Sequence, residues 1–208
     1  MRTNALILSF TAAACFLAWP ASAKNPAYRI QTAPGEFEVT VYIAHSCHTP
    51  EAARRVAERT ASQLFGRIGV SVRFIHAEPP PADREAIALR VMEHAPGSLE
   101  PYVLGSAWVA REHPQADIFC DRLVQFYSSG DWHEFGVIQG YAMAHELGHL
   151  LRANRGHSAE GIMRACWKRR DVILMLQGIV NFCRPDAERI REVLSERGRE
   201  KLVRAGEN

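Results

Sequence analysis

Two histidines and a glutamate stand close together in the run AHELGHLL, residues 144–151. On a helix, His145 and His149 lie on one face a turn apart, so both imidazoles can reach a single Zn²⁺ at about 2.0 to 2.1 Å. Glu146 is rotated about 100° from His145, so its carboxylate can approach a metal-bound water without binding the metal. Zinc lowers the pKa of that water to roughly 7, and the carboxylate can accept the proton. The spacing predicts zinc-assisted hydrolysis of a carbonyl compound.

The surroundings of this motif argue against a chance occurrence. With nine histidines in 208 residues, one such spacing arises by chance in roughly a few per cent of chains. Here it lies in an apolar stretch that predicts a buried helix. Its apolar residues are Ala142, Met143, Ala144, Leu147, Leu150 and Leu151. Burying two histidines and a glutamate without partners is costly, and a metal ion is the simplest compensation. Gly148 costs about 1 kcal/mol in mid-helix relative to alanine, which suggests that another backbone approaches there.

A catalytic zinc site of this kind needs a third protein ligand. The preferred candidate is His157, eight residues after His149 and directly after Gly156. Glu160 and Glu188 compete with it. Glu160 follows His157 by only three residues, so we expect the turn that presents one side chain to point the other away.

The motif resembles that of the metzincins, zinc peptidases with the pattern H-E-x-x-H-x-x-G-x-x-H and a methionine-containing turn beneath the metal. The chain departs from this pattern in its second half, where Arg152 replaces the glycine and Arg155 replaces the third histidine. An arginine is permanently charged and cannot serve as a zinc ligand. His157 comes two residues later, and the run Gly-Ile-Met at 161–163 resembles the methionine turn.

The resemblance implies a zincin-like fold and a zinc cofactor held by His145, His149 and His157, with Glu146 as general base. It implies a secreted metalloendopeptidase whose partner is a peptide or protein substrate. Some zincins use a downstream glutamate as third ligand, which keeps Glu160 and Glu188 as alternatives. Two other functions remain: a zinc-binding module without turnover, or a zinc amidase or deacetylase acting on a non-peptide amide. Glu146 argues against the module, since a structural site has no use for a base.

The N-terminus predicts export. Arg2 precedes an apolar run at residues 6–19, and Ala-Ser-Ala at 21–23 has the small residues of a cleavage site. We therefore expect a signal peptide at 1–23 and a secreted or periplasmic mature chain. The apolar run is shorter than the roughly 18 to 20 residues that a membrane-spanning helix needs, and no later segment could span, so no stable membrane anchor is expected after cleavage.

The charge balance excludes some partner classes. The formal net charge is +2 for the whole chain, and Arg2 is the only charged residue in the signal, so the mature chain carries +1 (2 − 1). This balance predicts no nucleic-acid partner. The composition gives no prediction of the oligomeric state.

Four cysteines remain after the signal: Cys47, Cys120, Cys166 and Cys183. An even number in an exported chain predicts disulfides, and four cysteines allow three pairings. We favour Cys166–Cys183 because these residues are close in sequence, which leaves Cys47–Cys120. The sequence contains no C-x-x-C pair, so it does not predict a cysteine-rich zinc site.

Hydrophobic periodicity predicts an α/β (α+β) fold with a mixed twisted sheet of about five strands packed on helices. The expected strands are residues 37–43, 70–75, 87–92, 105–110 and 118–126. The expected helices are residues 50–67, 135–152 and 185–197. Residues 24–208 suffice for a single zincin-like domain, with an N-terminal subdomain at about 36–153 and a small helical C-terminal subdomain at 154–208.

Several other polar residues are less informative. His45 and His48 flank Cys47 and could hold a second metal ion, but surface histidines are common at a strand-to-helix junction, so we expect no site there. Tyr127 and Tyr141 could donate to an oxyanion, although no spacing supports either one.

Overall fold

The structure is a computed structural model, and it describes residues 36–206 except 81–82, 84, 110–112 and 128–129. The predicted signal peptide, residues 1–23, lies outside the described residues. The described residues belong to one unit of the chain, Thr32–Asn208. Among them, no helix is both long and apolar enough to cross a membrane.

A five-stranded sheet lies at the centre of this unit, in the order β2-β1-β3-β5-β4. The strands are β1 Phe37–His45, β2 Val70–Ile75, β3 Ile87–Met92, β4 Gly105–Val109 and β5 Pro114–Phe119. All neighbouring pairs are parallel except β4 and β5, which are antiparallel. The sheet is therefore mixed, with β4 as an antiparallel edge strand, and the predicted fold class is confirmed.

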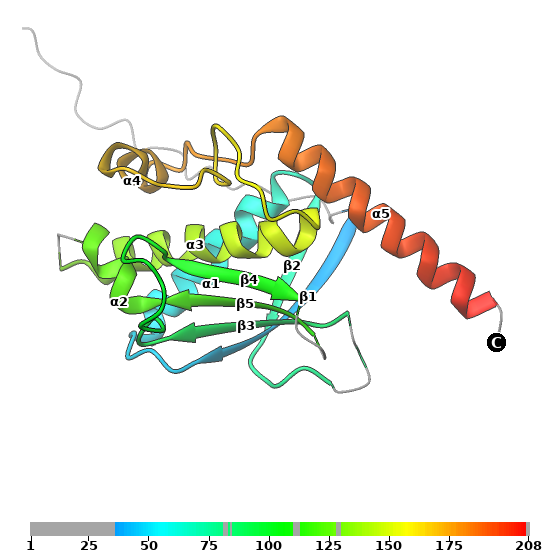
Figure 1. Cartoon of the computed structure of the whole chain (residues 1–208), viewed down its shortest axis with the longest axis horizontal. Helices are drawn as coiled ribbons and strands as arrows, with labels where there is room; N and C mark the ends of the chain where they lie inside the picture. The colour runs from blue at the N-terminus through cyan, green and yellow to red at the C-terminus, as the bar shows by residue number, and fades with distance from the viewer. Residues whose placement is uncertain (1–35, 81–82, 84, 110–112, 128–129, 207–208) are drawn as a thin grey trace, which may run out of the picture. The chain divides into compact units, whose positions relative to one another are not determined.

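Two helices, α1 Glu51–Gly66 and α3 Trp132–Arg152, pack against one face of the sheet (Figure 1). They approach each other closely through small residues. A Cβ added at Gly136 would lie 2.5 Å from the carbonyl oxygen of Ala53, and one added at Gly140 would lie 2.5 Å from that of Ala57. Because the two backbones are in contact at two successive turns, the position of α3 is fixed against α1 and the sheet.

α3 has an ordinary side-chain cap at its N-terminus and ends at an alanine in a left-handed conformation. The Asp131 side chain accepts a hydrogen bond of 2.8 Å from the backbone N–H of His133, as an N-cap should. At the other end, Ala153 adopts a left-handed conformation with φ of 52°, which stops the helix. The helix begins three residues before the predicted start, Phe135, and ends at the predicted Arg152.

Two further helices lie C-terminal to α3: α4 Arg169–Leu176 and α5 Arg184–Gly206. α5 extends beyond the predicted 185–197 and packs against α3 and β1. α4 was not predicted. At its start, Asp171 accepts a hydrogen bond of 2.7 Å from the backbone N–H of Lys168, and Val172 and Met175 are buried.

The predicted strand at 118–126 is wrong. β5 begins earlier, at Pro114, where a missing N–H is tolerated because it is the first residue of the strand. The chain then turns at Cys120 into the short helix α2, Cys120–Leu123, and a 3₁₀ turn, Val124–Phe126. A short apolar run fits a buried strand or a helical turn equally well, so periodicity could not separate the two.

One of the two predicted disulfides is present. Cys47 and Cys120 are bonded, joining the connection after β1 to the start of α2. The predicted Cys166–Cys183 bond is wrong, because both residues are free thiols. α4 occupies the chain between them, and Cys183 instead donates a hydrogen bond of 2.9 Å to the carboxylate of Asp186. Closeness in sequence therefore did not bring these two sulfurs together.

Candidate metal centre

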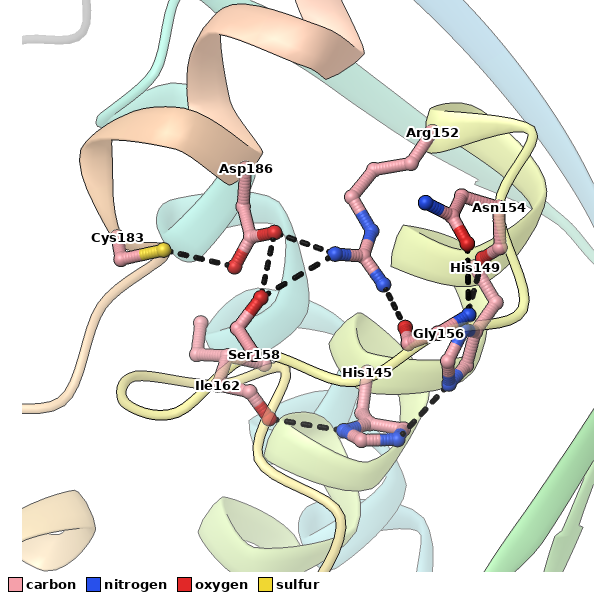
Figure 2. Close-up of polar contacts among 9 residues, drawn as sticks. All are labelled: His145, His149, Arg152, Asn154, Gly156, Ser158, Ile162, Cys183 and Asp186. Atoms are coloured by element: carbon pink, nitrogen blue, oxygen red, sulfur yellow. Dashed lines mark hydrogen bonds and ion pairs between the residues drawn. The ribbon is translucent and has the colours of Figure 1, made fainter.

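The buried helix α3 presents His145 and His149 to one point in space, as the i, i+4 spacing predicts. Their Nε2 atoms are 3.1 Å apart. The Nδ1 atom of His145 lies 2.8 Å from the carbonyl oxygen of Ile162, and that of His149 lies 3.1 Å from the carbonyl oxygen of Asn154 (Figure 2). A carbonyl oxygen can only accept, so each Nδ1 carries the proton and donates it.

This arrangement leaves two unprotonated nitrogens facing each other. In a neutral imidazole whose Nδ1 is protonated, Nε2 carries a lone pair. Burial, together with neighbouring positive groups, lowers the pKa of His145 to about 3, and burial lowers the pKa of His149 below its ordinary value. Both rings are therefore neutral at neutral pH. Two lone pairs at 3.1 Å repel unless a cation lies between them, and backbone carbonyls that hold Nδ1 are the usual outer partners of metal-ligating histidines. The residues present fit a zinc ion.

His157 lies beside these two rings. Its ring centroid is 5.3 Å from that of His145 and 4.9 Å from that of His149. One nitrogen from each of the three residues lies within 4.8 Å of the others, so the group could hold a metal ion. His157 is exposed, and burial and the charge of Arg152 lower its pKa. It therefore has the neutral form that a metal requires.

The loop that carries His157 is held by Arg152, the last residue of α3. Its guanidinium donates to the carbonyl oxygen of Gly156 and, at 3.3 Å, to the hydroxyl of Ser158 (Figure 2). It also forms an ion pair with Asp186 at the start of α5. Arg152 is thus the centre of a buried polar network that shapes the chain on both sides of His157.

Glu146 lies next to the histidines and is almost fully buried, with 7% of its surface exposed. Burial, with a smaller effect from the Asp117 carboxylate, raises the pKa of Glu146 to about 8. The edge strand β4 approaches it closely, because a Cβ added at Gly105 would lie 2.8 Å from Glu146 Cγ and 2.9 Å from its Oε1. Glycine at this position therefore leaves room for the carboxylate.

A cleft of about 540 Å³ opens over the three histidines and Glu146. One wall is the edge strand β4, from Gly105 to Trp108. Trp167 also lines the cleft, with its ring edge-on to His145 at 5.7 Å between centroids, and its indole N–H donates to the carbonyl oxygen of Ile162 at 3.3 Å. The cleft gives a ligand access to the histidine nitrogens.

Met163 lies beneath the helix and is fully buried. A Cβ added at Gly148 would lie 2.5 Å from the sulfur of Met163 and 3.2 Å from Cε1 of Phe182. The close approach predicted at Gly148 therefore exists, but side chains make it and not another backbone.

The other residues considered from the sequence lie away from this centre. Glu160 is exposed and lines a separate hollow, and Glu188 is exposed on α5 in an ion pair with Arg184. Tyr141 is buried and donates to the carbonyl oxygen of Val180 at 3.0 Å. Neither glutamate stands beside the histidines, and Tyr141 is committed elsewhere.

Sequence reasoning missed three residues that shape the site: Arg152 as a loop organiser, Gly105 and Trp167. A signal existed for the first two. Arg152 continues an apolar helical run, where a charge must find a buried partner. A glycine inside a strand often marks a close approach. Trp167 lies outside the motif, and nothing in its local sequence indicates the contact with His145.

No family model matches this sequence, and no curated protein matches it. Among solved structures, a zinc-dependent peptidase from Methanocorpusculum labreanum is similar, with a TM-score of 0.52 and 18% sequence identity. The match covers 72% of this chain and 99% of that chain. At this identity the likeness shows the fold alone.

Proposed function

We propose that this chain is an exported zinc-dependent endopeptidase of the metzincin-like type. The observation that carries the proposal is the pair of unprotonated Nε2 atoms of His145 and His149, 3.1 Å apart, beside the buried carboxyl of Glu146 in an open cleft. A structural zinc site would be closed by a fourth protein ligand and would need no base. Among the described residues, no fourth ligand joins the three histidines.

In the proposed reaction, His145, His149 and His157 hold the metal. A zinc ion bound there supplies Lewis-acid chemistry, polarising a carbonyl and lowering the pKa of a water to roughly 7. Glu146 accepts the proton of the attacking water and passes it to the leaving amine. The pKa of Glu146 is raised in the metal-free protein. A nearby cation favours the ionised form of the carboxylate, which is the form that can accept a proton.

A peptide substrate is favoured by the edge strand in the cleft wall. Among the residues that the structure describes, β4 is the last strand of the sheet, and one side of its backbone has no neighbouring strand. The cleft runs along its residues Gly105–Trp108. An extended peptide can add to such an edge through main-chain hydrogen bonds, which a small non-peptide amide cannot do.

Two further features support parts of the proposal. The buried Met163 packs against Gly148 below the histidines, in keeping with the resemblance to the methionine turn. The Cys47–Cys120 disulfide is in keeping with export, because such bonds persist in oxidising compartments.

The test is digestion of an unbiased peptide library by the zinc-loaded mature chain, with Glu146→Gln as the matched control. The amide keeps the shape of the side chain but cannot accept a proton. We expect internal cleavage by the wild type and a loss of about 10² to 10⁴ in rate for the variant, with its zinc content unchanged. Full turnover by the variant, or no cleavage by either protein, would contradict the proposal.

A further inference from the structure

A second group of metal-ligating side chains lies where β1, α1 and β2 meet. His45 is the last residue of β1, Glu58 lies in α1, and His76 follows β2 directly. The two strands are parallel neighbours, with Tyr42 opposite Ile75. Their carboxyl ends therefore meet at one edge of the sheet, and the helix that connects them adds the third side chain. One ligand atom from each of the three residues lies within 4.8 Å of the others.

His45 is the buried member of the group and has unsatisfied nitrogens. Its side chain is 5% exposed, and neither ring nitrogen has a hydrogen-bond partner among the described residues. A buried polar group without a partner costs about 1 to 3 kcal/mol. Its Nε2 points at Glu58, but the separation from Oε1 is 3.6 Å, which is too long for a hydrogen bond.

The spacing of the three groups fits a metal ion between them. Tetrahedral ligands at about 2.0 to 2.1 Å from zinc are roughly 3.3 to 3.4 Å from one another. Glu58 Oε1 lies 3.6 Å from His45 Nε2 and 3.2 Å from His76 Nε2. The two imidazole rings are stacked, with centroids 5.8 Å apart. An ion placed among these atoms would bind Nε2 of His45, one of its two ring nitrogens without a partner among the described residues.

Two imidazoles and one carboxylate are a ligand set that binds divalent first-row transition metals. Since His76 is exposed, solvent can reach the site.

The group is separate from the centre on α3, because none of its three residues lines the catalytic cleft. His48, which also flanks Cys47, does not belong to the group. Its side chain is 94% exposed and its Nδ1 lies 3.2 Å from Glu93. The sequence offered His45 and His48 as a possible pair, but the partner that the fold brings to His45 is His76.

We propose that His45, Glu58 and His76 form a second binding site for a divalent transition metal ion, which ties the two strands to α1. The site is independent of the proposed peptidase activity and does not require it. Zinc is the probe for its test.

The experiment measures zinc stoichiometry by elemental analysis after the mature chain has been depleted with a chelator, reloaded with Zn²⁺ and desalted. We expect two zinc ions in the wild type, and one in His76→Ala and in Glu58→Gln. His48→Ala is the matched control, with an exposed histidine removed three residues from His45, and should keep two. Since His76 is exposed, its removal should not prevent folding.

Removing a ligand of the other centre separates the two sites. His149→Ala should still hold one zinc ion, and adding zinc should raise the melting temperature of this variant. The double variant His149→Ala/His76→Ala should hold no zinc. One zinc in the wild type together with none in His149→Ala would overturn this proposal while leaving the peptidase proposal standing. Loss of the second zinc in His48→Ala but not in His76→Ala would also overturn it.

Discussion

The guanidinium of Arg152 and the carboxylate of Asp186 form a buried ion pair between the end of α3 and the first turn of α5, with side chains only 6% and 4% exposed. The same pair holds the loop around His157, because Arg152 donates to the Gly156 carbonyl oxygen and Asp186 accepts a hydrogen bond of 2.8 Å from Ser158. Arg152, at the position where the resemblance to metzincins leads one to expect glycine, thus organises the loop that carries His157.

Replacing this arginine should damage both the fold and the metal site. Arg152→Met leaves Asp186 buried without its charged partner, and breaking a buried pair in this way costs roughly 3 to 5 kcal/mol. Zinc affinity should fall as well, because the His157 loop loses its support. Chemical denaturation and zinc titration measure the two effects. Arg155→Met is the control, since Arg155 is exposed and its loss should leave stability nearly unchanged. Equal stability of both variants would contradict the role given to Arg152.

His157 should be the third zinc ligand. His157→Ala should weaken zinc binding by more than about 100-fold, since loss of an outer-shell partner alone already costs 10- to 100-fold. Glu160→Ala and Glu188→Ala should leave binding nearly intact, because both carboxylates lie away from the histidines. Competition with a chromogenic chelator gives the three affinities. A large loss in either glutamate variant, with little in His157→Ala, would reassign the ligand.

The stability of the metal-depleted protein should depend on pH through Glu146. Its pKa is about 8 in the fold, against 4.5 as the ordinary value. Between these values the folded protein keeps a proton that the unfolded chain has released, so stability falls as pH rises through this window. The expected loss relative to Glu146→Gln is on the order of a few kcal/mol. His145, whose pKa is about 3, has the opposite effect on the pH dependence of stability. This effect is present in both the wild type and Glu146→Gln, so it does not contribute to the difference between them.

Denaturation curves from pH 5 to pH 8, measured on metal-depleted wild type and Glu146→Gln, test this dependence. The free energy of unfolding of the wild type should drop relative to that of the variant as the pH rises. Parallel profiles would show that Glu146 is not held in its protonated form.

The mature chain should contain two free thiols. Two disulfides would leave no free thiol. Thiol titration of the denatured, unreduced protein should find Cys166 and Cys183. In the folded protein Cys166 should react first, because it is exposed, whereas Cys183 is half-buried and burial raises the pKa of its thiol. Cys166→Ser should remove the fast phase. A titration that finds no thiol would restore the second disulfide.

The parts of the fold that the sequence predicted are those set by local periodicity. The strands at 70–75 and 87–92 have the predicted bounds, and the helix carrying the histidines ends at the predicted Arg152. In each of these elements one face is buried, so the apolar residues recur with the period of a strand or of a helix, and this period predicts the element. The i, i+4 histidine pair follows from helix geometry alone, so its convergence was predictable too.

The parts that failed depend on contacts between distant segments. The chain turns at Cys120 where the disulfide to Cys47 ties it, and no local pattern shows that this apolar run changes from strand to helix. The free thiols of Cys166 and Cys183 reflect the unpredicted helix α4 between them. The pairing of His45 with His76 arises from the parallel register of β1 and β2, which periodicity does not specify.

The position of the metal tests the central claim most directly. Crystals of the zinc-loaded mature chain should give an anomalous-scattering peak at the zinc absorption edge, bound by His145, His149 and His157 at about 2.0 to 2.1 Å, with Glu146 beside it and unbound. A carboxylate in place of His157, His157 turned to solvent, or no peak at these three residues would contradict the account.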